Sequence, residues 1–102
     1  MKYRRRFQNK NRMEIEEVSG TPVKFAGFHE MKFFVHQNKT QLPCLGWWQV
    51  CDAKTGIAVS GFWNCKKTAI RVAGETLEHL GIEKTKIRLY DELVRLENMG
   101  VN

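Results

Sequence analysis

The chain has 102 residues, 42% of them hydrophobic and 11% aromatic, which fits one domain with a modest core. No apolar run is long enough to span a membrane, and no apolar segment follows the charged N-terminus. These features argue against a membrane protein and a signal peptide, and they predict a cytoplasmic protein. The formal net charge is +6 at pH 7, and it is distributed unevenly along the chain.

All of the excess positive charge lies in residues 1 to 12, whereas the basic and acidic residues of the remaining chain cancel. Tyr3 and Phe7 are interleaved with the basic residues, and such a segment can neutralise phosphates and stack on bases. We therefore predict a flexible arm that is disordered until it meets a partner, with a solubilising tail as the alternative. Its candidate nucleic-acid-binding residues are Lys2, Arg4, Arg5, Arg6, Lys10 and Arg12.

Residues 13 to 102 are expected to form a single α+β domain. Residues 13 to 22 are acidic and indicate a short strand or a helical turn before a loop. Residues 23 to 28 and 31 to 37 are typical of extended segments, and residues 38 to 46 give the longest loop signal. The expected fold is a small antiparallel sheet of three or four strands, packed on a helix and followed by a C-terminal helix.

Residues 47 to 63 predict a central β-hairpin, because two runs of strand-forming residues flank a turn cluster that ends in Gly56. The expected opposite pairs are Trp47 with Trp63, Cys51 with Val59, and Trp48 with Phe62. The more apolar face, which should lie on the core, carries Trp47, Cys51, Ile57, Val59 and Trp63. Trp48 and Phe62 then lie side by side on the other face, either covered by another segment or exposed as a platform for base stacking.

The hairpin leads into an amphipathic helix, for which Asn64 is the predicted N-cap and Gly81 the residue that ends it. The apolar stripe of this helix is Ala69, Ala73, Thr76, Leu77 and Leu80. Its outer face begins with basic residues, although the helix dipole favours anions at this end. A basic helix start is suited to phosphate or carboxylate, and the alternative is a solvated face. The candidate binding residues here are Lys66, Lys67 and Arg71.

Residues 85 to 98 predict a second helix with a wide apolar surface. Its stripe is Leu89, Leu93 and Leu96, widened by Ile87, Tyr90, Val94 and Met99. This helix is expected either to cap the domain or to pair with the same helix of a second copy, which would give a homodimer.

The sequence contains no pattern that predicts catalysis, a cofactor or a metal site. Cys44, Cys51 and Cys65 form no CxxC pair, and their spacing is unlike that of common zinc modules. His29 and His36 do not supply a favourable spacing for further ligands, and there is no P-loop or GxGxxG motif. We therefore expect a protein that is not an enzyme and requires no cofactor.

The segment of residues 61 to 81 contains Gly61, Lys66, Lys67, Ala69 and Ala73. With these residues it resembles the last strand and helix of a double-stranded RNA-binding domain. In that family the strand leads into a helix start rich in lysine and alanine, and the lysines grip phosphates. Cys65 replaces the serine of the family pattern, Ile70 replaces its third lysine, and Arg71 follows one position later.

A second pattern begins in the hairpin and runs into the helix start, and its residues are Trp48, Val50, Thr55, Gly56, Lys66, Lys67, Ala69 and Ile70. Through these residues the chain also resembles small accessory proteins of phages and other mobile elements. It implies a cytoplasmic protein that binds DNA or RNA, or that blocks a host nucleoprotein as anti-CRISPR proteins do.

The sequence thus predicts a small basic protein that binds nucleic acid or a nucleoprotein complex without catalysis. The predicted contacts are the N-terminal arm and the basic helix start, with Trp48 and Phe62 beside them. Two alternatives stay open: an anti-CRISPR-like inhibitor of a host nucleoprotein nuclease, and a homodimeric protein-interaction module.

Overall fold

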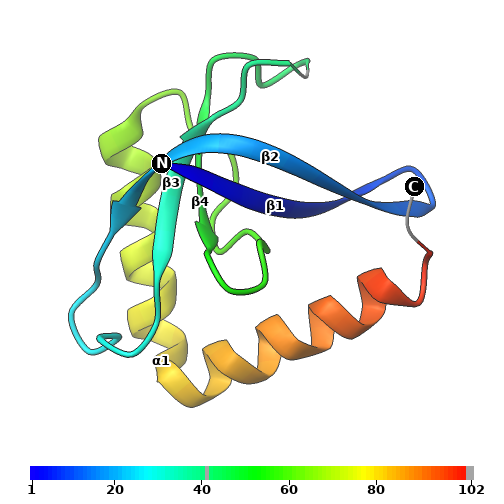
Figure 1. Cartoon of the computed structure of the whole chain (residues 1–102). Helices are drawn as coiled ribbons and strands as arrows, with labels where there is room; N and C mark the ends of the chain where they lie inside the picture. Colours follow the sequence, from blue (N-terminus) through cyan, green and yellow to red (C-terminus); the bar gives the residue numbers. More distant parts are fainter. Residues whose placement is uncertain (41, 101–102) are drawn as a thin grey trace.

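The computed structural model describes residues 1 to 40 and 42 to 100. Four antiparallel strands form one curled sheet in the order β1-β2-β3-β4, and a long C-terminal helix packs against it (Figure 1). This architecture confirms the predicted α+β class. The elements are β1 (Lys2–Asn9), β2 (Arg12–Val23), β3 (Phe33–Gln37), β4 (Trp48–Asp52) and α1 (Lys66–Glu97).

Residues 2 to 9 form strand β1, in place of the flexible arm that their composition predicted. β1 pairs with β2 through a turn at Lys10, which adopts a φ of 58°. The register places Arg5 opposite Glu16, so the basic residues of one strand meet the acidic residues of the next. A basic segment has too little apolar surface to fold by itself. This one is ordered because it pairs with an acidic strand and packs against the sheet.

β2 bends at Gly20 and so belongs to both halves of the sheet. Residues 12 to 19 pair with β1, and residues 20 to 23 pair with β3. At the bend the rings of Tyr3 and Phe34 stack with centroids 4.2 Å apart. A Cβ atom at Gly20 would lie 2.9 Å from the Phe34 ring, so this packing requires glycine. The bend carries β1 across the face of β3 and β4 that α1 leaves uncovered (Figure 1).

The main hydrophobic core lies between α1 and the sheet. The buried residues that form it are Phe28, Phe33, Val35 and Val50 with Ala69, Ala73 and Leu77 of the helix. Ala69, Ala73 and Leu77 of the predicted stripe thus face the core, whereas Thr76 is exposed. The two small alanine side chains let the helix approach the sheet closely.

The predicted register of the central hairpin is wrong. The observed bridges are Trp48 with Trp63 and Cys51 with Ala58, and no continuous second strand follows β4 in the described residues. Between the two bridges the amides of Val59 and Ser60 both donate to the carbonyl of Val50, at 2.9 and 3.3 Å. Two amides on one carbonyl form a β-bulge, which brings Trp63 instead of Gly61 opposite Trp48. The register already differs from the prediction at the turn, where the amide of Asp52 donates to the carbonyl of Ile57 at 2.9 Å, and this one-residue shift changes which side chains share a face.

The observed register separates the two aromatics that were expected to lie side by side. Trp48 packs on the α1 side of the sheet, whereas Phe62 packs on the β1 side. On β4, Cys51 is fully buried but faces β1, whereas Trp48 and Val50, which were assigned to the less apolar face, pack on the α1 side. After the turn, Ile57 and Val59 contact the core as predicted. Trp47 and Trp63, which were expected in the core, are 39% and 38% exposed.

Helix α1 changes direction at Gly81, where the sequence predicted a helix end. Gly81 has a φ of 77° and a ψ of 165°, a conformation that glycine adopts without a steric penalty. The N-cap is Cys65, one residue later than the predicted Asn64.

The half of α1 beyond the kink caps the domain below the β1–β2 hairpin (Figure 1). Leu89 and Leu96 pack against Met13 of β2 and against Ile57, and the four residues form a second core cluster. The amide of Met13 also donates to the carbonyl of Gly100 at 3.0 Å. Of the two expected roles for this helix, capping is therefore present within one chain. Pairing with a second copy stays a prediction.

Candidate nucleic-acid interface

Two tryptophans and two lysines gather where the sheet passes into α1. We call this group the helix-start surface: Trp48, Trp63, Lys66 and Lys67. The ammonium of Lys66 lies 5.3 Å from the centroid of the Trp48 ring, which is the geometry of a cation–π contact. Trp63 exchanges two backbone hydrogen bonds with Trp48, of 2.6 and 2.8 Å, so both indoles lie on one face.

The N-terminus of α1 presents unsatisfied amides beside this surface. Cys65 forms no side-chain hydrogen bond as the N-cap, and the first turn contains no acidic residue. The amides at the start of a helix and the ammonium groups of Lys66 and Lys67 attract anions at the same place. Lys67 is exposed and therefore available to a partner.

The thiol of Cys65 lies beside the same amides, and its pKa is lowered. When the sulfur is ionised it can accept hydrogen bonds from the backbone and side chain of Thr68 and from the backbone of Lys67, and this stabilisation of the thiolate is what lowers the pKa. Each of these contacts stabilises negative charge on the sulfur atom. The start of α1 is thus an environment that favours an anion.

Arg71 lies one turn further along the helix and completes the basic residues predicted there. It forms an ion pair with Glu75 at 2.9 Å, and the two side chains are 63% and 61% exposed. An exposed pair at this spacing contributes only about 0.3–0.5 kcal/mol, so Arg71 can exchange it for another anionic partner.

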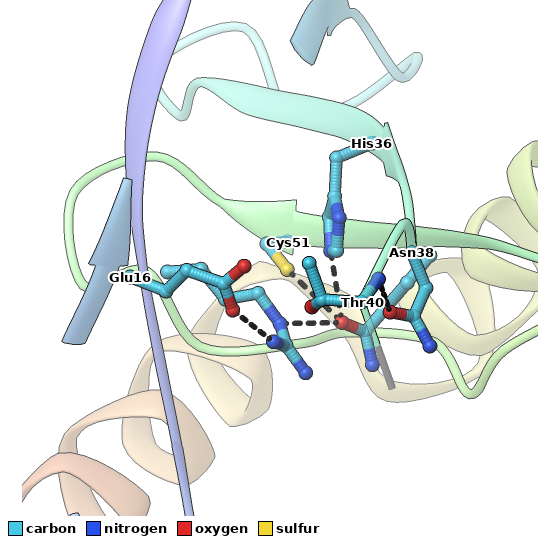
Figure 2. A network of polar contacts seen from close by, with 7 residues as sticks. Glu16, His36, Asn38, Thr40 and Cys51 are labelled. Carbon is cyan, nitrogen blue, oxygen red and sulfur yellow. Dashed lines mark hydrogen bonds and ion pairs between the residues drawn. The ribbon is translucent and has the colours of Figure 1, made fainter. Parts of the chain in front are cut away.

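Arg5, predicted to bind nucleic acid, is a buried structural residue. It is only 6% exposed, and its guanidinium donates to Glu16 Oε2 at 3.1 Å and to Gln49 Oε1 at 3.2 Å (Figure 2). The guanidinium also lies 4.0 Å from the centroid of the Phe7 ring. Because these contacts engage the guanidinium inside the protein, Arg5 is not available to the phosphate that was predicted as its partner.

The Gln49 side chain connects this arginine to a buried polar network (Figure 2). His36 Nε2 lies 3.1 Å from Gln49 Oε1, and the thiol of Cys51 donates to the same oxygen at 3.6 Å. Burial lowers the pKa of His36 and raises the pKa of Cys51 to about 12, so both groups are neutral at pH 7. The network holds β1 on the sheet, and we assign it no chemical reaction.

The other basic residues of the hairpin have mixed surroundings. Arg6 donates to the backbone carbonyl of Thr55 at 3.0 Å, and Lys2 donates to Ser19 at 3.1 Å. The exposed residues are Arg4, Lys10 and Arg12. Their positions are compatible with contact to a partner, whereas Arg6 helps to hold the turn after β4.

The structure does not bring the predicted basic residues into one site. The tip of the β1–β2 hairpin lies at one side of the molecule and the start of α1 at the other (Figure 1). Phe62 is also separate from the helix start, because its ring contacts His36 at 6.1 Å between centroids and lies below Arg5. The sequence did not predict Trp63 as part of the binding surface, because the alternation of apolar and polar residues does not reveal the bulge that places it beside Trp48.

Among residues 1 to 40 and 42 to 100, no group of histidine, cysteine and acidic side chains could hold a metal ion. The same described residues include no helix that is both long and apolar enough to cross a membrane. Comparison with protein-family models, with curated proteins and with solved structures gives no match to this chain.

Proposed function

We propose that this protein binds nucleic acid, free or within a nucleoprotein, without catalysing a reaction, and that the helix-start surface makes the contact. The observation that carries this proposal is the position of Lys66 over the Trp48 ring, beside the half-exposed Trp63 and the uncapped end of α1. These groups offer an aromatic face and a cationic end within one small area.

The chemistry of this surface favours single-stranded over duplex nucleic acid. Phosphate oxygens would accept hydrogen bonds from the lysines and the free amides of α1. An unpaired base would stack on the exposed indole of Trp63, a contact worth about 1–3 kcal/mol per base. Bases in a duplex are already stacked on one another and cannot make this contact.

The exposed cations of the hairpin would contribute attraction at longer range. Arg4, Lys10 and Arg12 are exposed, and the chain carries a formal net charge of +6. Such charges raise the association rate and make the affinity depend on salt, but they read no sequence.

The test is fluorescence anisotropy with labelled single-stranded and duplex oligonucleotides across a series of salt concentrations. Lys66→Glu/Lys67→Glu should abolish measurable binding while helicity is kept, because acids at a helix start suit the dipole. Trp63→Ala should weaken single-strand binding by about tenfold. Lys24→Glu/Lys84→Glu is the matched control, since it changes the net charge equally at exposed sites elsewhere.

Three results would contradict this proposal. The first is wild-type affinity in the folded helix-start double variant. The second is equal loss of affinity in that variant and in the charge-matched control, which would reduce binding to unspecific attraction. The third is duplex binding as tight as single-strand binding, which would remove the role assigned to Trp63.

A further inference from the structure

The half of α1 beyond Gly81 forms one wall of a groove of about 720 Å³. The opposite wall consists of the residues before β3 and the turn that follows β4 (Figure 1). A backbone hydrogen bond of 2.8 Å from Ala53 to Lys32 joins the two loops of that wall. This hydrogen bond holds the two loops together as one wall of the groove.

The floor of this groove is apolar. It is formed by Met31, Leu89 and Leu93, and Tyr90 stands at its edge with 65% of its surface exposed. Leucine and methionine side chains can pack around another aliphatic or aromatic side chain, and methionine adapts its shape to do so. They offer no flat ring for base stacking, and the ring of Tyr90 belongs to the edge and not to the floor, so the floor suits a protein segment better than a nucleic acid.

The rim of the groove has an excess of positive charge. Its two acids are engaged within the chain, because Glu30 pairs with Lys86 and Asp52 accepts hydrogen bonds from Thr55 at 2.7 and 2.9 Å. The side chains of Lys32 and Lys54 line the same rim and are exposed. Neither forms an ion pair or a hydrogen bond with the part of the chain that the structure describes.

We propose that this groove binds a short segment of a partner protein in which large apolar residues are flanked by Asp or Glu. The apolar side chains would enter between Met31 and Leu93, and the carboxylates would pair with Lys32 and Lys54. The apolar residues of such a segment match the floor of the groove, where buried apolar area supplies affinity. Its carboxylates match the basic rim, where complementary charge selects the partner. This interface is separate from the helix-start surface and does not depend on nucleic-acid binding.

The test is selection from a display library of short random peptides on the intact protein, with counter-selection on Lys32→Glu/Lys54→Glu. Peptides that bind the native protein and are lost on this variant should carry acidic residues beside Leu, Phe or Trp. Anisotropy with one such labelled peptide should then show about tenfold weaker binding to the variant. Lys24→Glu/Lys84→Glu, which changes the net charge equally outside the groove, should bind the peptide nearly as the native protein does.

Tyr90→Ala provides a second, uncharged variant at a position exposed enough to leave folding intact. It should weaken the same peptide, and nuclear magnetic resonance should place the peptide-induced shifts at the groove. The proposal is overturned if no acidic and apolar consensus emerges, if the control variant loses as much affinity as the groove variant, or if the shifts lie elsewhere. Self-association through these same residues, detected by concentration-dependent shifts without peptide, would also overturn it by making a second copy the occupant.

Discussion

The substitution Arg5→Ala tests whether Arg5 stabilises the fold or binds phosphate. The native side chain donates two hydrogen bonds, to Glu16 at 3.1 Å and to Gln49 at 3.2 Å, and lies over the Phe7 ring. Losing one partner of a buried ion pair destabilises a protein by about 3–5 kcal/mol. Glu16 keeps 33% of its side-chain surface in water, so its lost partner is partly replaced and we expect about 2–3 kcal/mol.

For a domain of this size each kcal/mol lowers Tm by about 4–8 °C, so Arg5→Ala should melt roughly 10–20 °C earlier. Urea unfolding followed by circular dichroism gives the free energy directly. Arg4→Ala is the matched control on the same strand; its side chain is exposed, and the expected change is within about 0.5 kcal/mol. An Arg5→Ala protein that melts like the native one but loses its affinity for oligonucleotides would refute the structural role.

Three further predictions follow from the buried and strained positions. Because burial lowers the pKa of His36 below 6.5, the neutral imidazole stabilises the fold above that pH, and this stabilisation is lost as the pH falls. The urea midpoint should therefore decrease below pH 6.5, and His36→Gln should weaken the pH dependence of the midpoint. Near neutral pH, iodoacetamide should alkylate Cys65 well before Cys51, because the pKa of Cys65 is lowered and that of Cys51 is about 12. Mass spectrometry would follow the alkylation of each cysteine, and unfolding in urea should remove the difference between their rates. Gly56→Ala should lower the free energy of unfolding by more than about 2 kcal/mol, because its Cβ would collide with the carbonyl oxygen of Arg4 and lie 3.0 Å from the amide nitrogen of Arg6. Gly27→Ala has a similar positive φ but open space, so thermal unfolding should show a cost of about 1 kcal/mol.

The local features of this protein are determined by its sequence. The apolar spacing of Ala69, Ala73 and Leu77 defines the helix face on the core, and Gly81 interrupts the helix where it was expected to end. The basic start of that helix is also a sequence property, since Lys66 and Lys67 need only the helix itself to lie beside its free amides. Such signals depend on neighbours within one or two turns, so a single sequence contains them.

Tertiary structure decided the role of β1 and the pairing of the tryptophans. Arg5 is separated from Gln49 by 44 positions, and no local pattern states that its charge will be buried there. Trp63 lies opposite Trp48 because a β-bulge at Val59 shifts the pairing of the two segments, and no period-two pattern encodes that shift. Burial of a charge and the register of a bulged pair depend on contacts made only after the chain has folded, and these contacts decide which basic and aromatic residues stay available to a partner.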